Sequence, residues 1–182
     1  MKRLQAYSIA LTLAAFTIIS CKKHPNQLPP ETQTGAGTFG CLVNGEIFWP
    51  AGAQLSGGSL QCNYQYVDKG YYFILIARNR KISNHIRSVG IFTDSLKIEE
   101  GSKLKLLPRK NGNPSGDYFK AVSAWEHELY QTDGGSNTGE LWIKKLDTIN
   151  QIVSGTFWFD ATDANGQKVE VREGRFDVHY TR

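Results

Sequence analysis

The sequence predicts an all-β fold, namely a single antiparallel β-sandwich or barrel-like domain of about 8–10 strands. Apolar and polar residues alternate over many short runs, which is the two-residue period of a pleated strand. Asn44-Gly45 and Asn165-Gly166, near the two ends of the domain, are pairs that tight β-hairpin turns favour. No segment shows the apolar spacing that a three-turn surface helix needs. The pattern does not separate an open sandwich from a closed barrel.

The longest predicted hairpin runs from Ser154 to Tyr180 and reverses at Asn165-Gly166. We expect a positive φ at both turn residues, as the turn that Asn-Gly favours requires. In the second arm Glu173-Gly174 interrupts the alternation, which is typical of a β-bulge. In the first arm one face carries Gly155, Phe157, Phe159 and Ala161, and the other carries Thr156, Trp158 and Asp160.

Glycine and proline divide the rest of the domain into shorter strands and loops. Tyr71–Ala77 is apolar on both faces, which predicts a central strand buried on two sides. Turn-forming residues predict loops at Arg109–Asp117 and Thr132–Gly139, and Asp94–Gly101 is compatible with a turn or two of helix. The other predicted strands span 38–43, 46–49, 59–67, 86–92, 104–107, 141–146 and one or two segments within 118–130.

Residues 1–20 are predicted to be a lipoprotein signal peptide. Lys2 and Arg3 precede an apolar run of about 14 residues, too short to cross a hydrocarbon core of ~30 Å comfortably. The run closes on Ile18-Ile19-Ser20-Cys21, which resembles the lipobox of bacterial lipoproteins. In those proteins cleavage leaves the cysteine at the mature N-terminus with acyl chains, so Cys21 is the predicted lipidated residue. The polar residues 21–37 are predicted to form a flexible tether, and residues 38–182 the β domain.

Charge and cysteine content restrict the partners and the covalent links. Losing Lys2 and Arg3 with the signal peptide lowers the formal net charge from +4 to +2, so charge gives no reason to expect a nucleic-acid partner. Cys41 and Cys62 form an even pair in an oxidising envelope compartment, and a disulfide between them would stabilise the fold by ~3 kcal/mol. The alternative is two buried free thiols that pack as small hydrophobic side chains.

Two clusters of ionisable residues provide candidate ligand contacts. Trp125 and His127 lie in the densest cluster, but in a strand His127 points away from the glutamates on either side of it, so no metal site is predicted. Arg175, Asp177 and His179 share one face of the last predicted strand. We expect these three to form a cross-strand polar ladder, with a ligand-binding patch as the alternative.

No catalytic residue and no cofactor is predicted. The chain has no GxSxG elbow, no phosphate-binding loop and no cysteine with a clear histidine partner. Asp160, Asp163 and Asn165 carry oxygen ligands, but the twelve-residue calcium-loop pattern is missing and a hairpin turn explains two of the three. Carboxylates that meet across a sheet leave no sequence signal, so hydrolysis of a glycan stays an alternative.

The order of these features is similar to a family of Bacteroidota lipoproteins that share a domain of unknown function. The matching segments are TFGCLVNGEIFWP at 38–50, GELWIKKLD at 139–147, IVSGTFWFDA at 152–161 and VREGRFDVHY at 171–180, besides the lipobox and the tether. The resemblance covers most of the mature chain. It implies an anchored β domain but no reaction, so it assigns no catalytic residue.

The predicted location is the periplasmic face of the outer membrane. Surface-exported lipoproteins of this bacterial group usually carry acidic residues after the lipidated cysteine, whereas Lys22-Lys23 stand there in this chain. We expect a non-enzymatic binding or structural module with a protein or glycan partner, held on the membrane by its lipid anchor. A shallow, aromatic-rimmed surface would favour this function. A cleft with two convergent acids would favour a glycan hydrolase, and a roomy apolar interior would favour a lipid or small-ligand carrier.

Overall fold

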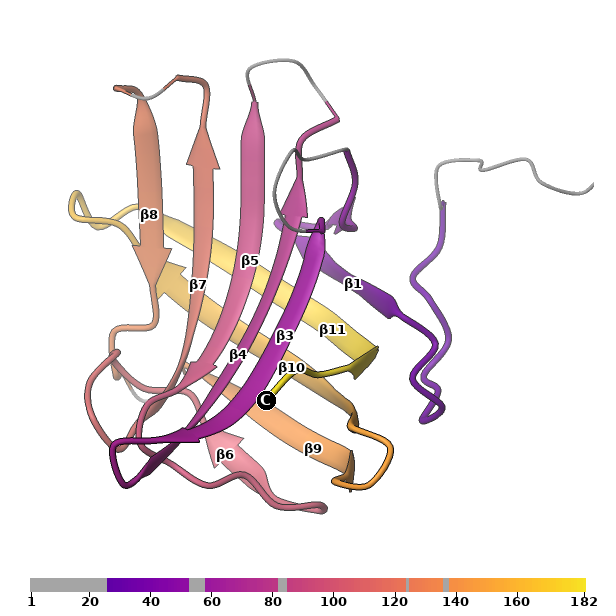
Figure 1. Ribbon diagram of the computed structural model, residues 1–182. Coiled ribbons are helices and arrows are strands. Elements are labelled where there is room, and N and C mark those ends of the chain that lie inside the picture. The colour runs from indigo at the N-terminus through magenta and orange to yellow at the C-terminus, as the bar shows by residue number, and fades with distance from the viewer. Residues whose placement is uncertain (1–25, 53–57, 82–84, 124, 136–137) are drawn as a thin grey trace, which may run out of the picture.

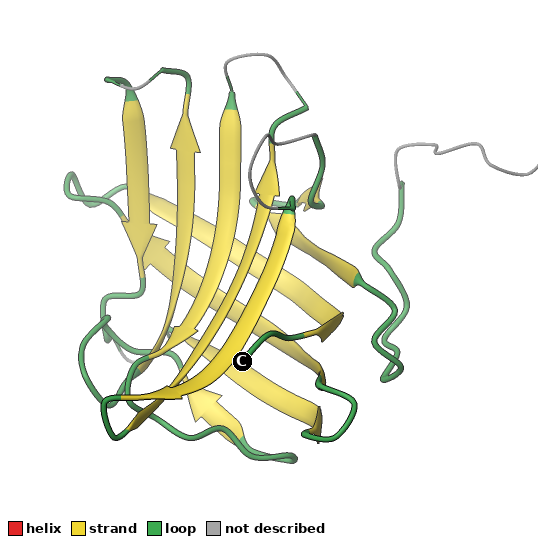
Figure 2. Ribbon diagram, viewed as in Figure 1, coloured by secondary structure: helices red, strands yellow, loops and turns green. Residues whose placement is uncertain are grey.

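The computed structural model describes residues 26–52, 58–81, 85–123, 125–135 and 138–182. The predicted signal peptide and Cys21 lie outside these residues. The described residues form eleven β-strands with no helix among them, which confirms the all-β prediction (Figure 2). The number of strands is just above the predicted range because the stretch 118–130 contains parts of two strands. No helix in the described part of the chain is long and apolar enough to cross a membrane.

The strands form one sheet that folds over into two layers, which cross at a steep angle in Figure 1. The front layer contains, in spatial order, β8 (His127–Gln131), β7 (Pro114–Ala121), β5 (Ile86–Thr93), β4 (Gly70–Asn79) and β3 (Leu60–Val67). The back layer contains β2 (Glu46–Phe48), β1 (Thr38–Val43), β11 (Lys168–His179), β10 (Ile152–Thr162), β9 (Gly139–Asp147) and β6 (Lys103–Lys105).

Two corners join the layers. At one corner Thr162 of β10 pairs with Gln131 of β8. At the other corner the tail after β11 pairs with the edge strand β3. There the Thr181 N–H donates to the Cys62 carbonyl at 3.0 Å, and the Tyr64 N–H donates to the Thr181 carbonyl at 2.8 Å. The last residues of the chain are therefore held beside β3.

Side chains from both layers fill the interior. Phe73 from the front layer and Phe159 from the back layer are fully buried, and burying such a side chain contributes roughly 1.5–3 kcal/mol. Gly116 on β7 leaves room for Phe159, because a Cβ at this position would lie 2.8 Å from the phenyl ring. A filled interior does not support the carrier alternative. Other fully buried side chains are Phe48, Leu75, Ile91, Ile98, Leu106, Leu141, Ile143, Val89, Val153 and Val171.

The β10–β11 hairpin has the predicted position, but its turn is of a different kind. Gly166 has a φ of 77°, whereas Asn165 is not among the residues with positive φ, so the prediction of positive φ at both residues is wrong. Asp163 explains the difference. Its carboxylate accepts the N–H groups of Asn165 at 2.9 Å and Gln167 at 2.7 Å, and its carbonyl accepts the N–H of Gly166 at 3.1 Å. The aspartate thus organises a longer loop around itself.

The predicted bulge in β11 is confirmed. Glu173 has a φ of 51°, and the pairing register of β10 with β11 shifts between Phe157 and Phe159. Gly174 lies opposite Phe157, and a Cβ there would come within 2.5 Å of the ring. Glycine at this position lets the aromatic ring pack against the backbone of the neighbouring strand.

Two details of the front layer differ from the prediction. Tyr71–Ala77 lies in β4, next to the edge strand β3, and from Tyr72 onward its residues alternate between partly exposed and buried. Its outer apolar residues pair with other apolar residues, as Ile74 does with Phe92, so double-sided apolar character does not indicate a central strand here. The predicted loop 109–117 ends early because Pro114 begins β7, and the first residue of a strand is a position where proline is tolerated.

The second half of the predicted tether is docked on the back layer. The carboxylate of Asp177 on β11 accepts the Thr32 hydroxyl at 2.6 Å and three backbone N–H groups, from Thr34 at 2.9 Å, Gly35 at 2.7 Å and Ala36 at 3.2 Å. The predicted flexible tether is therefore wrong for residues 32–36. The sequence suggested flexibility because this segment has almost no apolar residues, but polar bonds to one buried carboxylate hold it instead.

Cys41 on β1 and Cys62 on β3 are free thiols, so the disulfide alternative is not realised. They lie in different layers, and each is buried among core side chains. Burial raises the pKa of both thiols well above the ordinary range, which keeps them protonated and unreactive in the folded state.

Candidate functional site

A cleft of about 400 Å³ lies at the β3–β4 hairpin. We call it the tyrosine cleft because four of its lining residues are tyrosines. It is lined by Tyr64, Gln65, Tyr66, Val67, Tyr71, Thr148, Tyr180 and Arg182.

Strand alternation and register place the tyrosines together. Tyr64 and Tyr66 are two residues apart on β3, so they share a face, and Tyr66 lies directly opposite Tyr71 of β4. The ring centroids of Tyr64 and Tyr71 are 5.5 Å apart, and those of Tyr66 and Tyr71 are 4.8 Å apart. The tail that pairs with β3 brings in Tyr180, whose ring lies edge-on to Tyr64 at 5.8 Å. The result is a continuous aromatic wall.

The exposure of the rings changes along this wall. Tyr64 is 7% exposed and its hydroxyl donates to the Ile98 carbonyl at 3.3 Å, whereas Tyr66 is 61% exposed. Burial raises the pKa of Tyr64 to about 12, so its hydroxyl stays protonated at neutral pH. At the open side, the guanidinium of Arg182 donates to the Thr148 carbonyl. The cleft therefore combines open aromatic faces with polar groups at its rim.

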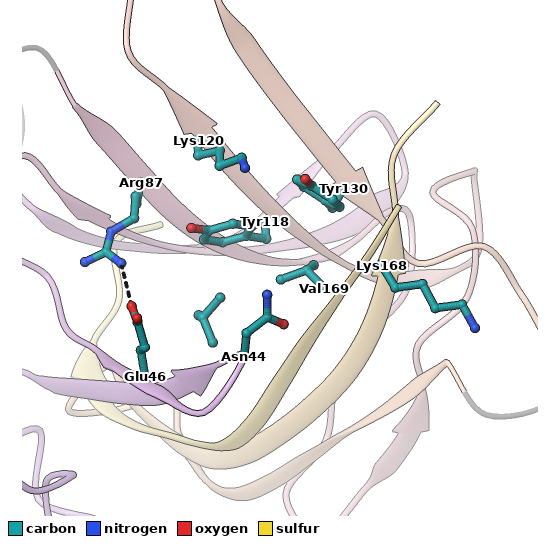
Figure 3. A pocket seen from close by; sticks show the side chains of 9 residues that line it. Asn44, Glu46, Arg87, Tyr118, Lys120, Tyr130, Lys168 and Val169 are labelled. Atoms are coloured by element: carbon teal, nitrogen blue, oxygen red, sulfur yellow. Dashed lines mark ion pairs between the residues drawn. The ribbon is translucent and has the colours of Figure 1, made fainter. Parts of the chain in front are cut away.

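A second, smaller pocket of about 200 Å³ lies between the layers at the other end of the front strands (Figure 3). We call it the end pocket. Arg87 of β5 and Lys120 of β7 lie on one side of it. Tyr118 contributes its ring, and burial raises the pKa of the Tyr118 hydroxyl. The remaining lining residues are Val43, Asn44, Glu46, Tyr130, Lys168 and Val169.

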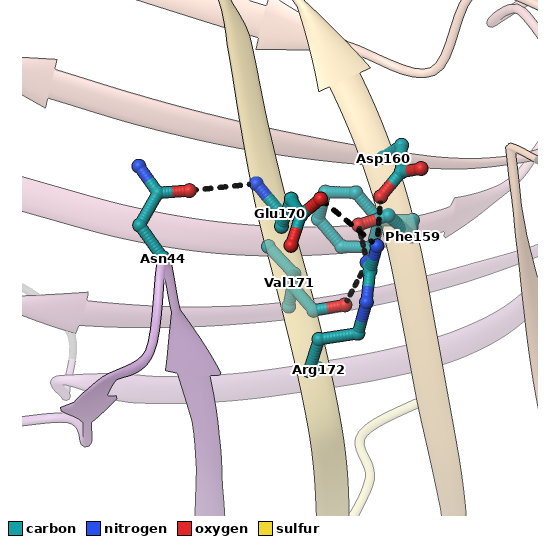
Figure 4. Close-up of polar contacts among 6 residues, drawn as sticks. All are labelled: Asn44, Phe159, Asp160, Glu170, Val171 and Arg172. Atoms are coloured by element: carbon teal, nitrogen blue, oxygen red, sulfur yellow. Dashed lines mark hydrogen bonds and ion pairs between the residues drawn. The ribbon is translucent and has the colours of Figure 1, made fainter.

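A network of polar contacts joins Asn44, which lines the end pocket, to β11, and joins β11 to β10 (Figure 4). The side-chain oxygen of Asn44 accepts the N–H of Glu170 at 2.8 Å, which fixes the amide orientation. Arg172 donates to the Phe159 carbonyl at 3.0 Å and pairs with the carboxylate of Asp160. Asp160 therefore serves as the ion-pair partner of Arg172 on the surface of the sheet.

Trp125 and His127, predicted as candidate ligand contacts, lie at the β7–β8 turn. Trp125 is 94% exposed. The His127 ring packs against Phe119, with ring centroids 5.9 Å apart. The neighbouring Glu128 instead pairs with Lys120 at 2.9 Å, so the residues of this cluster do not converge. Neither Trp125 nor His127 lines the tyrosine cleft or the end pocket.

Arg175, Asp177 and His179 do share the outer face of β11, but each has a local partner. Arg175 pairs with Glu173 at 3.3 Å, and Asp177 is occupied by the docked tether. The His179 ring covers Gly35, where a Cβ would come within 2.5 Å of Nε2, and its Nδ1 lies 3.2 Å from the Asn150 carbonyl. These contacts hold the N-terminal segment and leave Asp177 no open position for a ligand.

Carboxylates do not form an open pair in either concave region. The tyrosine cleft has none and the end pocket has Glu46 alone. A shallow groove on the outside of the back layer contains Glu31, Glu140 and Glu173, but two of these pair with Lys144 and Arg175. Among the described residues, no group of three or more histidine, cysteine and acidic side chains is placed to hold a metal ion.

Asp117 on β7 is a perturbed carboxyl that the sequence analysis did not single out. Burial raises its pKa to about 6, although Arg109 lies 3.9 Å away and favours the charged form. The Arg109 guanidinium also stacks over the Phe92 ring at 4.1 Å. The residue lies outside both concave regions, so its altered pKa reflects packing on the sheet surface.

Part of the tyrosine cleft has a signal in the sequence, although none of its residues is among the predicted contacts. Tyr64 and Tyr66 alternate on a predicted strand, and Tyr71 follows a short turn containing Asp68 and Gly70. A two-strand hairpin would bring these three rings to one face. The contribution of Tyr180 has no local signal, because it depends on the tail pairing with β3.

No family model, no curated protein and no solved structure matches this chain. The resemblance to Bacteroidota lipoproteins therefore stays a prediction, and only the geometry of the chain itself bears on its function.

Proposed function

We propose that this chain is a non-enzymatic glycan-binding module, tied by a lipid anchor at Cys21 to the periplasmic face of the outer membrane. The observation that carries the proposal is the aromatic wall of the tyrosine cleft. Three of its rings form one contiguous group, and the outermost ring, Tyr66, is 61% exposed.

Open aromatic faces suit a ligand that has both apolar and polar surfaces. A sugar ring presents C–H groups on its faces and hydroxyls at its edges, so it stacks on tyrosine while its edges form hydrogen bonds. Thr148 and Arg182 supply polar groups around the rings. A mostly aromatic surface with a few polar groups is the usual composition of a small-molecule site.

The cleft favours binding over hydrolysis. Glycoside hydrolysis ordinarily needs two carboxyl groups on either side of the scissile bond, and the lining of the tyrosine cleft contains neither aspartate nor glutamate. A protein partner would need a larger contact area than this cleft offers, so we favour a glycan.

Replacing Tyr66 by alanine is expected to weaken glycan binding about tenfold, because a stacking surface is lost. The lipid-free mature domain would be applied to a glycan array, and the tightest oligosaccharide would then be titrated calorimetrically into wild type and Tyr66→Ala. Tyr66 is exposed, so its removal should leave the fold intact.

Tyr72→Ala and Tyr71→Ala form the matched pair of controls for this experiment. Tyr71 and Tyr72 are neighbours on β4 and point to opposite faces of the sheet, and Tyr71 alone of the two lines the cleft. Tyr71→Ala should lose affinity and Tyr72→Ala should bind like wild type. Equal losses in both variants, or an array with no bound glycan, would contradict the proposal, as would a Tyr66-dependent protein partner without glycan binding.

Replacing Cys21 by serine is expected to move the chain from the membrane fraction to the soluble fraction, because the acyl chains provide its attachment. Membrane fractionation and mass spectrometry of the mature N-terminus would check this result. Protease treatment of intact cells would test the location: a periplasm-facing domain survives, and loss of the protein would overturn that part of the proposal.

A further inference from the structure

The end pocket collects hydrogen-bond donors at the opposite end of the front layer from the tyrosine cleft (Figure 3). The register places the two regions apart, since Arg87 pairs with Asn79 at one end of β4 and Val67 pairs with Gly70 at the other. Two cations, Arg87 and Lys120, extend toward the pocket, whereas the ammonium of the third lining cation, Lys168, points outward (Figure 3). Glu46 is the single lining carboxylate, and Glu128 pairs with Lys120 beside the pocket. The charge of Arg87 is therefore the less neutralised of the two.

Asn44 supplies a fixed neutral donor. It has a φ of 49° in the β1–β2 turn, and its backbone N–H donates to the Glu170 carbonyl at 2.8 Å. Its side-chain oxygen accepts the N–H of Glu170, also at 2.8 Å, which turns the Nδ2 group toward the pocket (Figures 3 and 4). The two bonds orient this donor before any ligand arrives.

Arg87 is held in place without being neutralised. Its guanidinium lies over the Phe48 ring at 5.9 Å and beside the hydroxyl of Tyr118 (Figure 3). The nearest carboxylate, Glu46, is 3.8 Å from Nη1 and its side chain is 80% exposed. Such a loose surface pair is weak, so another carboxylate or phosphate can replace Glu46 at low cost.

We propose that the end pocket binds an oxyanion, a carboxylate or phosphate group carried at the end of a larger envelope molecule. Arginine and an amide together present N–H groups that match the oxygens of such a group, and charge-assisted bonds of this type are strong. The volume of about 200 Å³ is below the ~300–1,000 Å³ of sites for drug-sized ligands, so the pocket admits one terminal group and not a whole molecule. This site is independent of the tyrosine cleft.

The test is an NMR titration of the mature domain with sodium glucuronate and, separately, inorganic phosphate. We expect at least one of them to produce saturable shifts of the Asn44 Nδ2 and Arg87 Nε signals, with binding that weakens as salt is raised. Comparing the two probes tells whether the group recognised is a carboxylate or a phosphate. Neutral glucose should leave both signals unchanged.

Variants separate this site from the general positive charge of the surface. Arg87→Gln and Lys120→Gln should each weaken oxyanion binding by at least about fivefold, because each removes a charge from the pocket. Lys103→Gln makes the same charge change on β6, where Lys103 lies over the Trp142 ring, and should bind like wild type. Lys120→Gln keeps the test valid if Arg87→Gln disturbs the fold, since the Lys120 side chain is half exposed.

Three results would overturn the inference: no saturable shift with either oxyanion, equal shifts with glucose, or equal weakening in Lys103→Gln. Tyr66→Ala should retain the oxyanion response in full. Failure of the end pocket is thereby distinguished from failure of the proposed glycan cleft.

Discussion

Replacing Asp177 by asparagine is expected to lower the free energy of unfolding by about 3 kcal/mol at pH 7. Asp177 is 1% exposed, and its carboxylate accepts bonds from Thr32, Thr34, Gly35 and Ala36. Asparagine has one acceptor oxygen and turns an NH2 group toward these donors, so several of them lose their partner. Urea denaturation of wild type and variant measures the difference.

The effect of Asp177→Asn should depend on pH. Burial alone would raise the pKa of Asp177, but the bonds from Thr32 and the backbone of Thr34, Gly35 and Ala36 outweigh it and hold the pKa below its ordinary value. A carboxyl with a lowered pKa in the folded state stabilises the fold above its unfolded pKa of about 3.9 and loses that contribution as the pH falls through the folded value. The difference between wild type and variant should therefore be full at pH 7 and shrink below about pH 4.

Glu170→Gln is the matched control, because it removes the same charge from an exposed position on the same strand. Its effect should stay within about 0.5 kcal/mol. Hydrogen exchange gives a second measurement, since the amides of Gly35 and Ala36 should lose protection in Asp177→Asn. An Asp177→Asn variant as stable as wild type, with these amides still protected, would show that the carboxylate does not hold the segment.

Replacing Gly155 by alanine is expected to cost about 3 kcal/mol or more of folding stability. A Cβ at this position would lie 2.2 Å from the Trp142 carbonyl oxygen and 2.9 Å from the Phe176 ring. The pairing of β10 with β9 is irregular between Ser154 and Gly155, and the close approach of the two backbones occurs there. A backbone carbonyl cannot move aside as a side chain can, so one strand must shift.

The order of three alanine variants makes this prediction specific. Gly116→Ala should cost less than Gly155→Ala, because its Cβ meets the Phe159 side chain at 2.8 Å and a ring can adjust. Gly135→Ala should be nearly neutral, since its nearest neighbour would be 3.4 Å away and its φ is not positive. Thermal denaturation of the three variants would measure the order. A Gly155→Ala protein as stable as Gly135→Ala would contradict it.

Local patterns predicted most of the strands and failed where a single side chain changed the backbone. Alternation located both arms of the β10–β11 hairpin and its bulge at Glu173. The Asn165-Gly166 pair indicated a two-residue turn. The carboxylate of Asp163 instead accepts the N–H groups of Asn165 and Gln167, and these bonds produce a longer loop. The turn type depends on which hydrogen bonds form. The Asn-Gly pair alone does not show that a third residue, Asp163, accepts hydrogen bonds from the neighbouring backbone amides.

The functional residues were harder to predict than the fold. The candidate contacts were chosen from clusters of ionisable residues. In the structure His127 packs against Phe119, and Asp177 holds the docked segment. The tyrosine cleft combines residues from β3 and β4 with Tyr180 and Arg182 from the end of the chain. Such a cleft forms between residues that are far apart in the sequence and close in space, and amino-acid composition gives no information on that proximity.

By itself the sequence determined that this chain is an all-β domain with hairpins at Asn44-Gly45 and near Asn165-Gly166, because strand period and turn preference are local properties of the backbone. Only the tertiary structure decided that residues 32–36 dock on Asp177, that Cys41 and Cys62 remain free thiols, and that the tail completes the tyrosine cleft. These outcomes depend on which layers and edges meet when the sheet folds over. They are long-range pairings, and each involves residues whose local sequence gives no sign of the partner.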